Sequence, residues 1–394
     1  MKYCLYFDNY LCISILMKVS IIVGGRFHAF NLAEQLSLNK NLNQLITSYP
    51  KFYLKNKYQI EQEKINSIIT KEILTRFIFK KIPYLQNFSI KHFDNKASKI
   101  INFKNLDILI GWSSFSLASF IKAQKYECIK ILERGSTHIE FQNKILKEEY
   151  ERNNLKPNLP SKFIIEKEKK EYEIADYISV PSEFVKKTFI EQGINESKII
   201  KIPYGVDLNE FRKLPKLSLN NNNNIFRIIY TGSICIRKGL IYLLKAFQEL
   251  NLKHSELLLV GEIENKFLKI LNKFKNNDSI KILKSMNQSE LYKHYNTSNI
   301  FVTCSIEEGL SMVQLQAMSC GLPIICTKNS GGEEIVTDGY DGFIIPIRNI
   351  EILKEKIKFF YENISKCNQM GENAKKKVDK YYSWESYGKN AIQT

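Results

Sequence analysis

Short apolar runs alternate along the chain with segments of helical periodicity. Residues 18–23 are typical of a buried strand, and apolar residues then recur near one face of a helix over residues 27–38. The apolar runs at residues 107–114, 128–132 and 176–182 each end in polar or small residues. Strands that alternate with helices predict βαβ units and a parallel sheet, and such sheets bind ligands at the carboxyl ends of their strands.

The pattern changes near residue 203 and then starts again. An Asn run at residues 220–224 favours a loop, because asparagines cannot fill a core. Residues 225–250 repeat the opening order of strand, glycine loop and helix. We therefore predict two Rossmann-like α/β domains that face each other across a cleft, and a C-terminal helix that packs back on the first domain. The expected ranges are 17–203, 204–379 and 380–394.

The first sixteen residues differ from the rest. They are apolar but contain Asp8 and Asn9, and they have no small-residue cleavage site. We interpret residues 1–16 as an extension outside the fold, since Met17 opens the first strand directly. No other apolar run reaches about 18 residues, so we expect no membrane-spanning segment.

Charge and cysteine content narrow the class of protein. The chain has 58 Lys and Arg against 41 Asp and Glu, a net charge of +17. This balance indicates either an anionic partner or a Lys-rich proteome with solvated surface charge, and both interpretations remain open. The eight cysteines form no C-x-x-C pair and no zinc spacing, which favours reduced, buried thiols in a cytoplasmic protein.

Residues 230–240 combine a glycine turn with two cations. Gly232 permits a sharp turn after a strand, and Arg237 and Lys238 precede the next helix. A helix N-terminus beside a guanidinium and an ammonium is a suitable diphosphate site, although a solvated basic loop is the simpler alternative. The segment lacks the G-x-G-x-x-G and P-loop spacings, so dehydrogenases and P-loop phosphotransferases are disfavoured.

A second motif lies in residues 305–323. Glu308 follows an apolar strand and could accept hydrogen bonds from the hydroxyls of a polyol. The backbone amides of Leu310, Ser311 and Met312 open a helix and could meet phosphate. Gln316 falls near the same helical face as Glu308, where a ribose diol would satisfy it. The alternatives are a helix-capping carboxylate and a solvated glutamine.

Together, "GSICIRKG" and "EEGLSMVQLQAMSCGLPII" resemble the C-terminal domain of retaining GT-B glycosyltransferases of family 4, in glycosyl transferase group 1. Residues 180–211 resemble the interdomain segment of that family, and residues 330–346 resemble its stretch near the end of the domain. The resemblance is specific in the C-terminal half of the chain and looser in the N-terminal half.

The resemblance implies roles for residues of the C-terminal domain. Arg237 and Lys238 would hold the donor diphosphate, with Gly232 in the preceding turn. Glu308 would contact the transferred sugar as a catalytic residue. Gln316 stands where the family usually has a ribose-binding Glu, so nucleotide binding should lose a charge-assisted bond. Ser311 stands where the family usually has Gly.

The N-terminal domain offers further candidates at the ligand end of its sheet. Gly24 and Gly25 form the first strand-to-helix loop, which in the family closes over the donor phosphates; a plain tight turn is the alternative. His138 resembles the family histidine near the transferred sugar, with a structural role equally open. Arg134 and His28 are acceptor-side candidates, and helix packing or capping is favoured for His28.

The predicted function is retaining transfer of a sugar from a UDP- or GDP-sugar to a glycan or lipid-linked acceptor, in surface polysaccharide, lipopolysaccharide or glycolipid synthesis. The resemblance implies no metal and no cofactor, and the chain has no Asp-x-Asp motif. The alternatives are a non-catalytic sugar-nucleotide or glycan-binding subunit, an epimerase or a phosphorylase. No nucleic-acid module is found.

Residues 71–93 mix Lys, Arg and aromatic residues. Two interpretations of this stretch are equally open. It is either a peripheral contact with an anionic membrane, on the inner face, or a helix that covers the sheet and has a solvated basic face.

Overall fold

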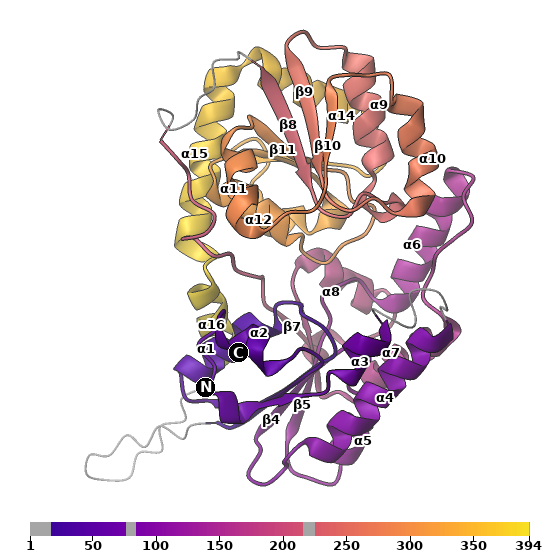
Figure 1. Cartoon of the computed structure of the whole chain (residues 1–394), viewed down its shortest axis with the longest axis vertical. Helices are drawn as coiled ribbons and strands as arrows, with labels where there is room; N and C mark the ends of the chain where they lie inside the picture. The colour runs from indigo at the N-terminus through magenta and orange to yellow at the C-terminus, as the bar shows by residue number, and fades with distance from the viewer. Residues whose placement is uncertain (1–16, 76–83, 216–224, 394) are drawn as a thin grey trace.

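The computed structural model describes residues 17–75, 84–215 and 225–393. The predicted extension at residues 1–16, the Asn run at 220–224 and residues 76–83 of the basic stretch lie outside the described residues. Two α/β units stand one above the other (Figure 1). Each is built on a parallel sheet, which confirms the predicted fold class.

The first unit contains a seven-stranded sheet in the order β3-β2-β1-β4-β5-β6-β7, in which every pair is parallel. Its strands are β1 (Val19–Val23), β2 (Leu42–Thr47), β3 (Ile65–Ser67), β4 (Ile108–Trp112), β5 (Ile129–Glu133), β6 (Tyr177–Val180) and β7 (Ile199–Lys201). Its helices are α1 (Ala29–Leu38), α2 (Lys51–Lys55), α3 (Thr70–Ile73), α4 (Tyr84–Ile100), α5 (Leu117–Ala123), α6 (Ile139–Arg152), α7 (Lys162–Ile174) and α8 (Glu183–Ile190).

The second unit contains a six-stranded parallel sheet in the order β10-β9-β8-β11-β12-β13. Its strands are β8 (Phe226–Thr231), β9 (Ser255–Val260), β10 (Ile280–Leu283), β11 (Ile300–Thr303), β12 (Ile324–Thr327) and β13 (Gly342–Ile345). Its helices are α9 (Leu240–Leu250), α10 (Leu268–Leu271), α11 (Gln288–Asn296), α12 (Met312–Ser319), α13 (Gly332–Ile335), α14 (Ile350–Glu362) and α15 (Ile364–Tyr381). Single 3-10 turns connect several of these elements, among them η6 (Ile236–Lys238).

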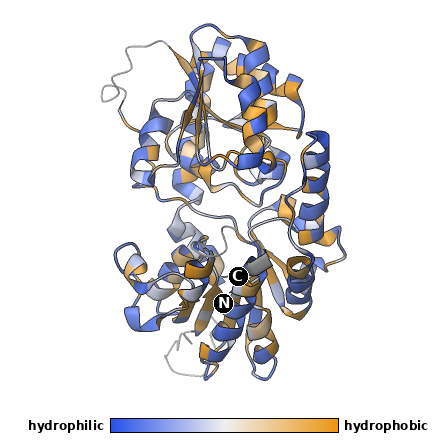
Figure 2. Cartoon of the chain, turned by 45° about the vertical axis from the view of Figure 1, so that its right-hand side comes forward, coloured by the Kyte–Doolittle hydropathy of each residue, from blue (hydrophilic) through white to orange (hydrophobic). Residues whose placement is uncertain are grey.

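The central strands are apolar on both faces because helices cover both sides of each sheet. Every residue of β1 and of β11 is buried. The helices are hydrophilic on the side that faces outward, away from the sheets (Figure 2). Polar caps fix where some of them begin, since the hydroxyls of Ser161 and Ser182 accept backbone N–H bonds at the starts of α7 and α8.

The chain returns to the first unit at its end. Helix α15 ends at Tyr381, just past the predicted boundary at residue 379, and Met370, Ala374 and Val378 lie on its buried face. The last helix, α16 (Trp384–Gln393), then packs against α1 in the first unit (Figure 1). The backbone N–H of Val206 donates to Tyr382 O at 2.8 Å, so the two interdomain crossings lie side by side.

The cysteines were predicted to be reduced and buried. All six cysteines in the described ranges are free, and all but the half-buried Cys235 are buried. Burial raises the pKa of Cys304 and Cys320 to about 12, so these thiols are inert packing residues.

None of the described helices is both long enough and apolar enough to cross a membrane.

Candidate active site

A cleft of about 1020 Å3 lies between the two units and is lined by both. Met312 and Gln316 of α12 and residues 286–289 after β10 contribute from the second unit. Arg26 and Phe27, which directly follow Gly24 and Gly25, contribute from the first. The carboxyl ends of both sheets therefore meet at one cavity, as parallel sheets require of a ligand site.

Gln316 is buried at the base of this cleft. Its Oε1 accepts a hydrogen bond from the hydroxyl of Tyr295 at 3.2 Å, and that hydroxyl shares a second bond of 2.6 Å with Thr231 Oγ1. The Nε2 of Gln316 has no partner among the described residues, which leaves an amide donor at the cleft. The side chain is thus fixed by its oxygen and can offer its nitrogen to a ligand hydroxyl.

The predicted cations Arg237 and Lys238 lie in η6, beside the end of β11. The ammonium of Lys238 forms an ion pair with Glu308 Oε1, and Ser305 Oγ donates to Glu308 Oε2 at 3.0 Å. Burial alone would raise the pKa of Glu308, but Lys238 and Arg237 lower it below its usual value. Glu308 is therefore an ionised acceptor for ligand hydroxyls rather than a proton donor.

Sequence reasoning missed Glu307, which is completely buried beside Glu308. Its Oε2 accepts from Arg237 Nε at 2.7 Å and from Gln142 Nε2 at 2.9 Å. Burial alone would raise its pKa, but Arg237 and hydrogen bonds from the first unit lower it to about 2. Arg237 of the second unit thus balances the charge of this carboxylate, and uncharged donors of the first unit add hydrogen bonds to it.

The other oxygen of Glu307 lies against the loop after β5. Ser136 Oγ and Thr137 Oγ1 each donate to Glu307 Oε1 at 2.7 Å, and the backbone N–H of Thr137 donates to it at 3.1 Å. Gly309 also contacts the first unit, because Ser182 Oγ donates to Gly309 O at 2.7 Å. A Cβ atom on Gly309 would lie 2.2 Å from Gly135 O, so only glycine permits this approach of the two units.

The backbone amides at the start of α12 are only partly available. The N–H of Ser311 donates to Ser330 O at 3.2 Å and is therefore engaged, contrary to the predicted row of three free amides. Within the described ranges, the N–H groups of Leu310 and Met312 have no backbone or side-chain partner. These two amides remain suitable for a phosphate oxygen.

The three glycines predicted near the diphosphate lie in loops at the carboxyl ends of strands. Gly232 follows β8 with a φ of +131°, a conformation that L side chains rarely adopt. Gly24 and Gly25 follow β1, and Gly24 packs so closely on Phe115 that a Cβ atom would lie 2.1 Å from the ring. Gly232 and Gly24 therefore favour glycine on structural grounds, and the phosphate contacts of all three glycines stay a prediction.

His138 lies at the predicted strand end, but its ring packs within the first unit. Its Nδ1 accepts from the backbone N–H of Glu140 at 3.3 Å and so caps α6. The ring contacts Tyr172 and Phe189, with centroids 4.9 and 5.1 Å away. Burial, Arg134 and Lys169 lower the pKa of His138 to about 4, so the imidazole is neutral.

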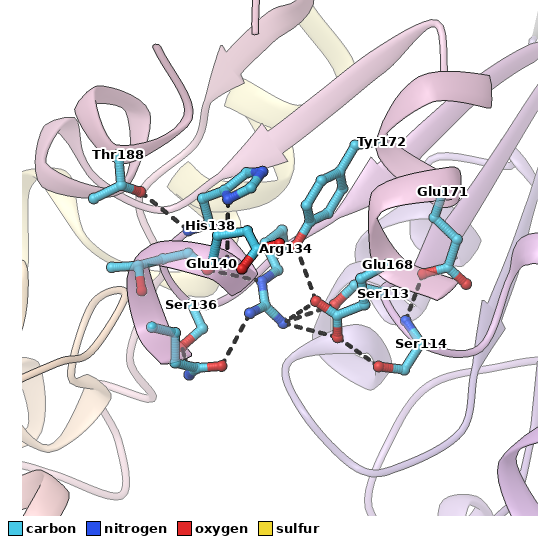
Figure 3. Close-up of polar contacts among 12 residues, drawn as sticks. Ser113, Ser114, Arg134, Ser136, His138, Glu140, Glu168, Glu171, Tyr172 and Thr188 are labelled. Carbon is cyan, nitrogen blue, oxygen red and sulfur yellow. Dashed lines mark hydrogen bonds and ion pairs between the residues drawn. The ribbon is translucent and has the colours of Figure 1, made fainter. Parts of the chain in front are cut away.

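The guanidinium of Arg134 points into a cluster of polar side chains that includes Glu168 and Ser113 (Figure 3), and Arg134 does not line the cleft. Its Nη1 pairs with Glu168 at 3.0 Å, its Nη2 donates to Gln142 at 3.2 Å and its Nε donates to Thr137 O at 3.1 Å. The side chain is buried in this network, which also includes Ser113. The structure thus uses Arg134 to hold the loop 135–138 rather than to meet a phosphate directly.

His28 is enclosed by aromatic rings at the start of α1. The ring centroids of Tyr204 and Trp112 lie 4.1 and 5.1 Å away, and Tyr387 of α16 covers the edge. Its Nε2 is 3.0 Å from Glu133 Oε1, although without the alignment of a hydrogen bond. This position agrees with the favoured packing role and leaves little access for an acceptor.

Comparison with known proteins connects this geometry to a family. Residues 212–377 match the family model of glycosyl transferases group 1. A lipopolysaccharide 1,2-N-acetylglucosaminetransferase of Salmonella typhimurium is 26% identical over 227 residues, which cover 53% of this chain and 59% of that protein. The capsular polysaccharide biosynthesis glycosyltransferase CapM of Staphylococcus aureus is 26% identical over 53% of this chain and 58% of its own length. The matched region thus spans little more than half of these relatives.

Solved structures extend the similarity to the whole fold. A sucrose-phosphate synthase from Thermosynechococcus elongatus superposes with a TM-score of 0.72 at 16% identity, over 96% of this chain and 98% of that one. HepE from Anabaena, solved in complex with UDP, superposes with a TM-score of 0.67 at 14% identity, over 96% and 99%. The fold is therefore GT-B, and the family match together with the relatives supports a GT-B glycosyltransferase of group 1.

Proposed function

We propose that the chain is a retaining, metal-independent glycosyltransferase of family 4, which moves a sugar from a nucleotide-sugar donor to an acceptor hydroxyl. One observation carries the proposal: Arg237, Lys238 and Glu308 converge beside the start of α12. Gln316 of the same helix offers its amide to the cleft. Two cations and helix amides are groups that bind a diphosphate, and an ionised carboxylate is an acceptor for the hydroxyls of a sugar.

The donor diphosphate would lie against Arg237, Lys238 and the amides of Leu310 and Met312. As the bond from sugar to phosphate breaks, negative charge grows on the leaving diphosphate, and these groups stabilise it. Glu308 would accept hydrogen bonds from hydroxyls of the transferred sugar. Its lowered pKa suits that role, because an ionised carboxylate accepts stronger bonds than a neutral one.

The comparisons support UDP as the first nucleotide to test and a glycan as the acceptor class. HepE was solved with UDP, and two relatives are named for lipopolysaccharide and capsular polysaccharide synthesis. We therefore place the chain in surface polysaccharide, lipopolysaccharide or glycolipid synthesis. A GDP-sugar remains the second donor to test.

The experiment is a titration with UDP and GDP by calorimetry, in the presence and absence of EDTA. A ligand at 100 times its dissociation constant should also stabilise the protein by about 2.7 kcal/mol. Arg237→Ala with Lys238→Ala should abolish binding, and the matched control is Lys245→Ala with Lys253→Ala, which removes two exposed basic side chains of the same domain. Intact binding and transfer in the Arg237/Lys238 variant would refute the assignment, and loss of binding with EDTA would refute metal independence.

Gln316 supports one alternative, a non-catalytic subunit that binds a sugar nucleotide. Such a protein would bind UDP or a UDP-sugar without transfer to any glycan acceptor. An epimerase on the same fold would instead convert the donor without an acceptor. A single incubation of protein, donor and acceptor, followed by analysis of all three products, separates these functions.

We also propose that the chain binds an anionic membrane surface through the exposed side of α4. Phe88 is 57% exposed there, and Lys91, His92, Lys96 and Lys99 line a shallow groove beside it. An aromatic side chain among cations suits the interface of a membrane with acidic headgroups. Vesicles with and without anionic lipid test this; equal sedimentation with both, at every salt concentration, would contradict it.

A further inference from the structure

Glu307 joins the two domains more closely than any predicted site residue. Its carboxylate accepts bonds from Ser136, Thr137 and Gln142 in the first domain. It accepts one more from Arg237 in its own domain. A fully buried carboxylate with these partners has a fixed orientation, since both of its oxygens are engaged.

This arrangement also fixes the guanidinium of Arg237. Its Nε donates to both the backbone oxygen and the Oε2 of Glu307, at 3.0 and 2.7 Å. Its Nη2 donates to Ser136 Oγ across the domain interface at 3.0 Å. A guanidinium has five N–H groups, so three of them remain, on Nη1 and Nη2, without a partner among the described residues.

The remaining N–H groups lie on the outer edge of the guanidinium, the edge that binds phosphate in a bidentate manner. The inner edge is held by Glu307 and by a hydroxyl of the opposite domain. Ser136 can reach Arg237 only while the loop 135–137 is docked on the segment 307–309. Gln142 reinforces that docking, since it also donates to Ser136 Oγ at 3.0 Å.

We propose that Glu307 is a positioning residue that holds Arg237, and that closure of the two domains completes the orientation of Arg237 toward the donor diphosphate through Ser136. The proposal rests on the proposed function, because it takes the diphosphate as the ligand of Arg237. Ser136 of the first domain is the second positioning residue, because it accepts a hydrogen bond from Arg237 Nη2. Domain closure and donor binding are then coupled through one side chain.

The test is a double-mutant cycle on UDP affinity. Ser136→Ala removes one hydroxyl at the interface and should weaken UDP binding several-fold. In an Arg237→Ala background, Ser136→Ala should cause a much smaller loss, because the effect of Ser136 on the diphosphate passes through Arg237. Ser197→Ala, at an exposed serine of the same domain, is the matched control and should leave the affinity unchanged. An equal fold-loss in both backgrounds, or no loss in either, would overturn the proposal.

A second measurement is independent of the ligand. Glu307→Gln keeps the shape of the side chain but removes its charge, and small-angle scattering should then show a larger radius of gyration than for the unaltered protein. If the unaltered protein binds neither UDP nor GDP, the proposed function fails. The scattering result still decides the interdomain part, since an unchanged curve for Glu307→Gln would overturn it.

Discussion

Replacement of Gly309 by alanine should push the two domains apart. The new Cβ atom would lie 2.2 Å from Gly135 O, 2.7 Å from Gly135 C and 3.0 Å from Pro181 Cγ. The first two atoms are backbone, so no side-chain rotation can relieve the contact. Ordinary contact begins near 3.4 Å, and the interface must therefore open by about 1 Å.

The magnitude follows from the cost of overpacking. One extra carbon in a closely packed contact costs about 1–3 kcal/mol. If the chain avoids this cost by separating its domains, the closed population falls by about 5- to 150-fold. The bond from Ser182 to Gly309 and those from the loop 135–137 to Glu307 are lost in the open form. Each domain keeps its own core, so thermal stability should fall far less than closure does.

Small-angle scattering and thermal unfolding together measure these two effects. Gly339→Ala is the matched control, because Gly339 has a φ of +74° and open space around it. That variant should lose about 1–2 kcal/mol from backbone strain alone, with no change in the radius of gyration. An unchanged radius of gyration for Gly309→Ala would refute the reasoning, since the clash would then have been absorbed within the closed interface.

Three further predictions concern single side chains. Gln316→Glu should tighten UDP binding by about tenfold in calorimetry, because a carboxylate forms a charge-assisted bond with a ribose hydroxyl; weaker binding would place the ribose elsewhere. The folded pKa of Glu307, about 2, lies below the usual 4.5, so its stabilisation is present above pH 4.5 and is lost as the pH falls toward 2. The urea-unfolding free energies of the protein and of Glu307→Gln should therefore differ by at most about 3 kcal/mol at pH 7 and converge in acid; a constant difference would contradict this. The imidazole resonances of His138 should stay constant in NMR spectra between pH 5 and 8 and titrate near pH 4, and a midpoint near 6.5 would show an exposed ring.

The fold was largely predictable because local pattern determines it. Strands that are buried on both faces are largely apolar, and Val19–Val23 and Ile300–Thr303 have that character, with one hydroxyl residue in each. The expected domain boundary at residue 379 falls within α15, which ends at Tyr381. The buried face of this helix ends at Val378, and residues 379–381 are exposed, so the apolar pattern does not show where the helix ends.

The site was predictable only in part, for a physical reason. The sequence shows that two carboxylates, Glu307 and Glu308, follow a strand. Adjacent side chains point in different directions, and the sequence does not show which of the two contacts the other domain. Glu307 and Ser136 are 171 residues apart, and no local periodicity connects them. One signal was available in the sequence. The two motifs contain two neighbouring cations, Arg237 and Lys238, and two neighbouring carboxylates, which is enough for two ion pairs.

The position of α16 has a consequence for how the protein folds during synthesis. Helix α16 packs on α1, and its Tyr387 covers His28 beside Tyr204. The ribosome makes these residues after the entire second domain. Domains usually fold in the order of their synthesis, but here the first sheet is complete long before its last covering helix exists. The aromatic pocket around His28 therefore stays open while the second domain is synthesised, and Tyr387 of α16 can cover it only afterwards.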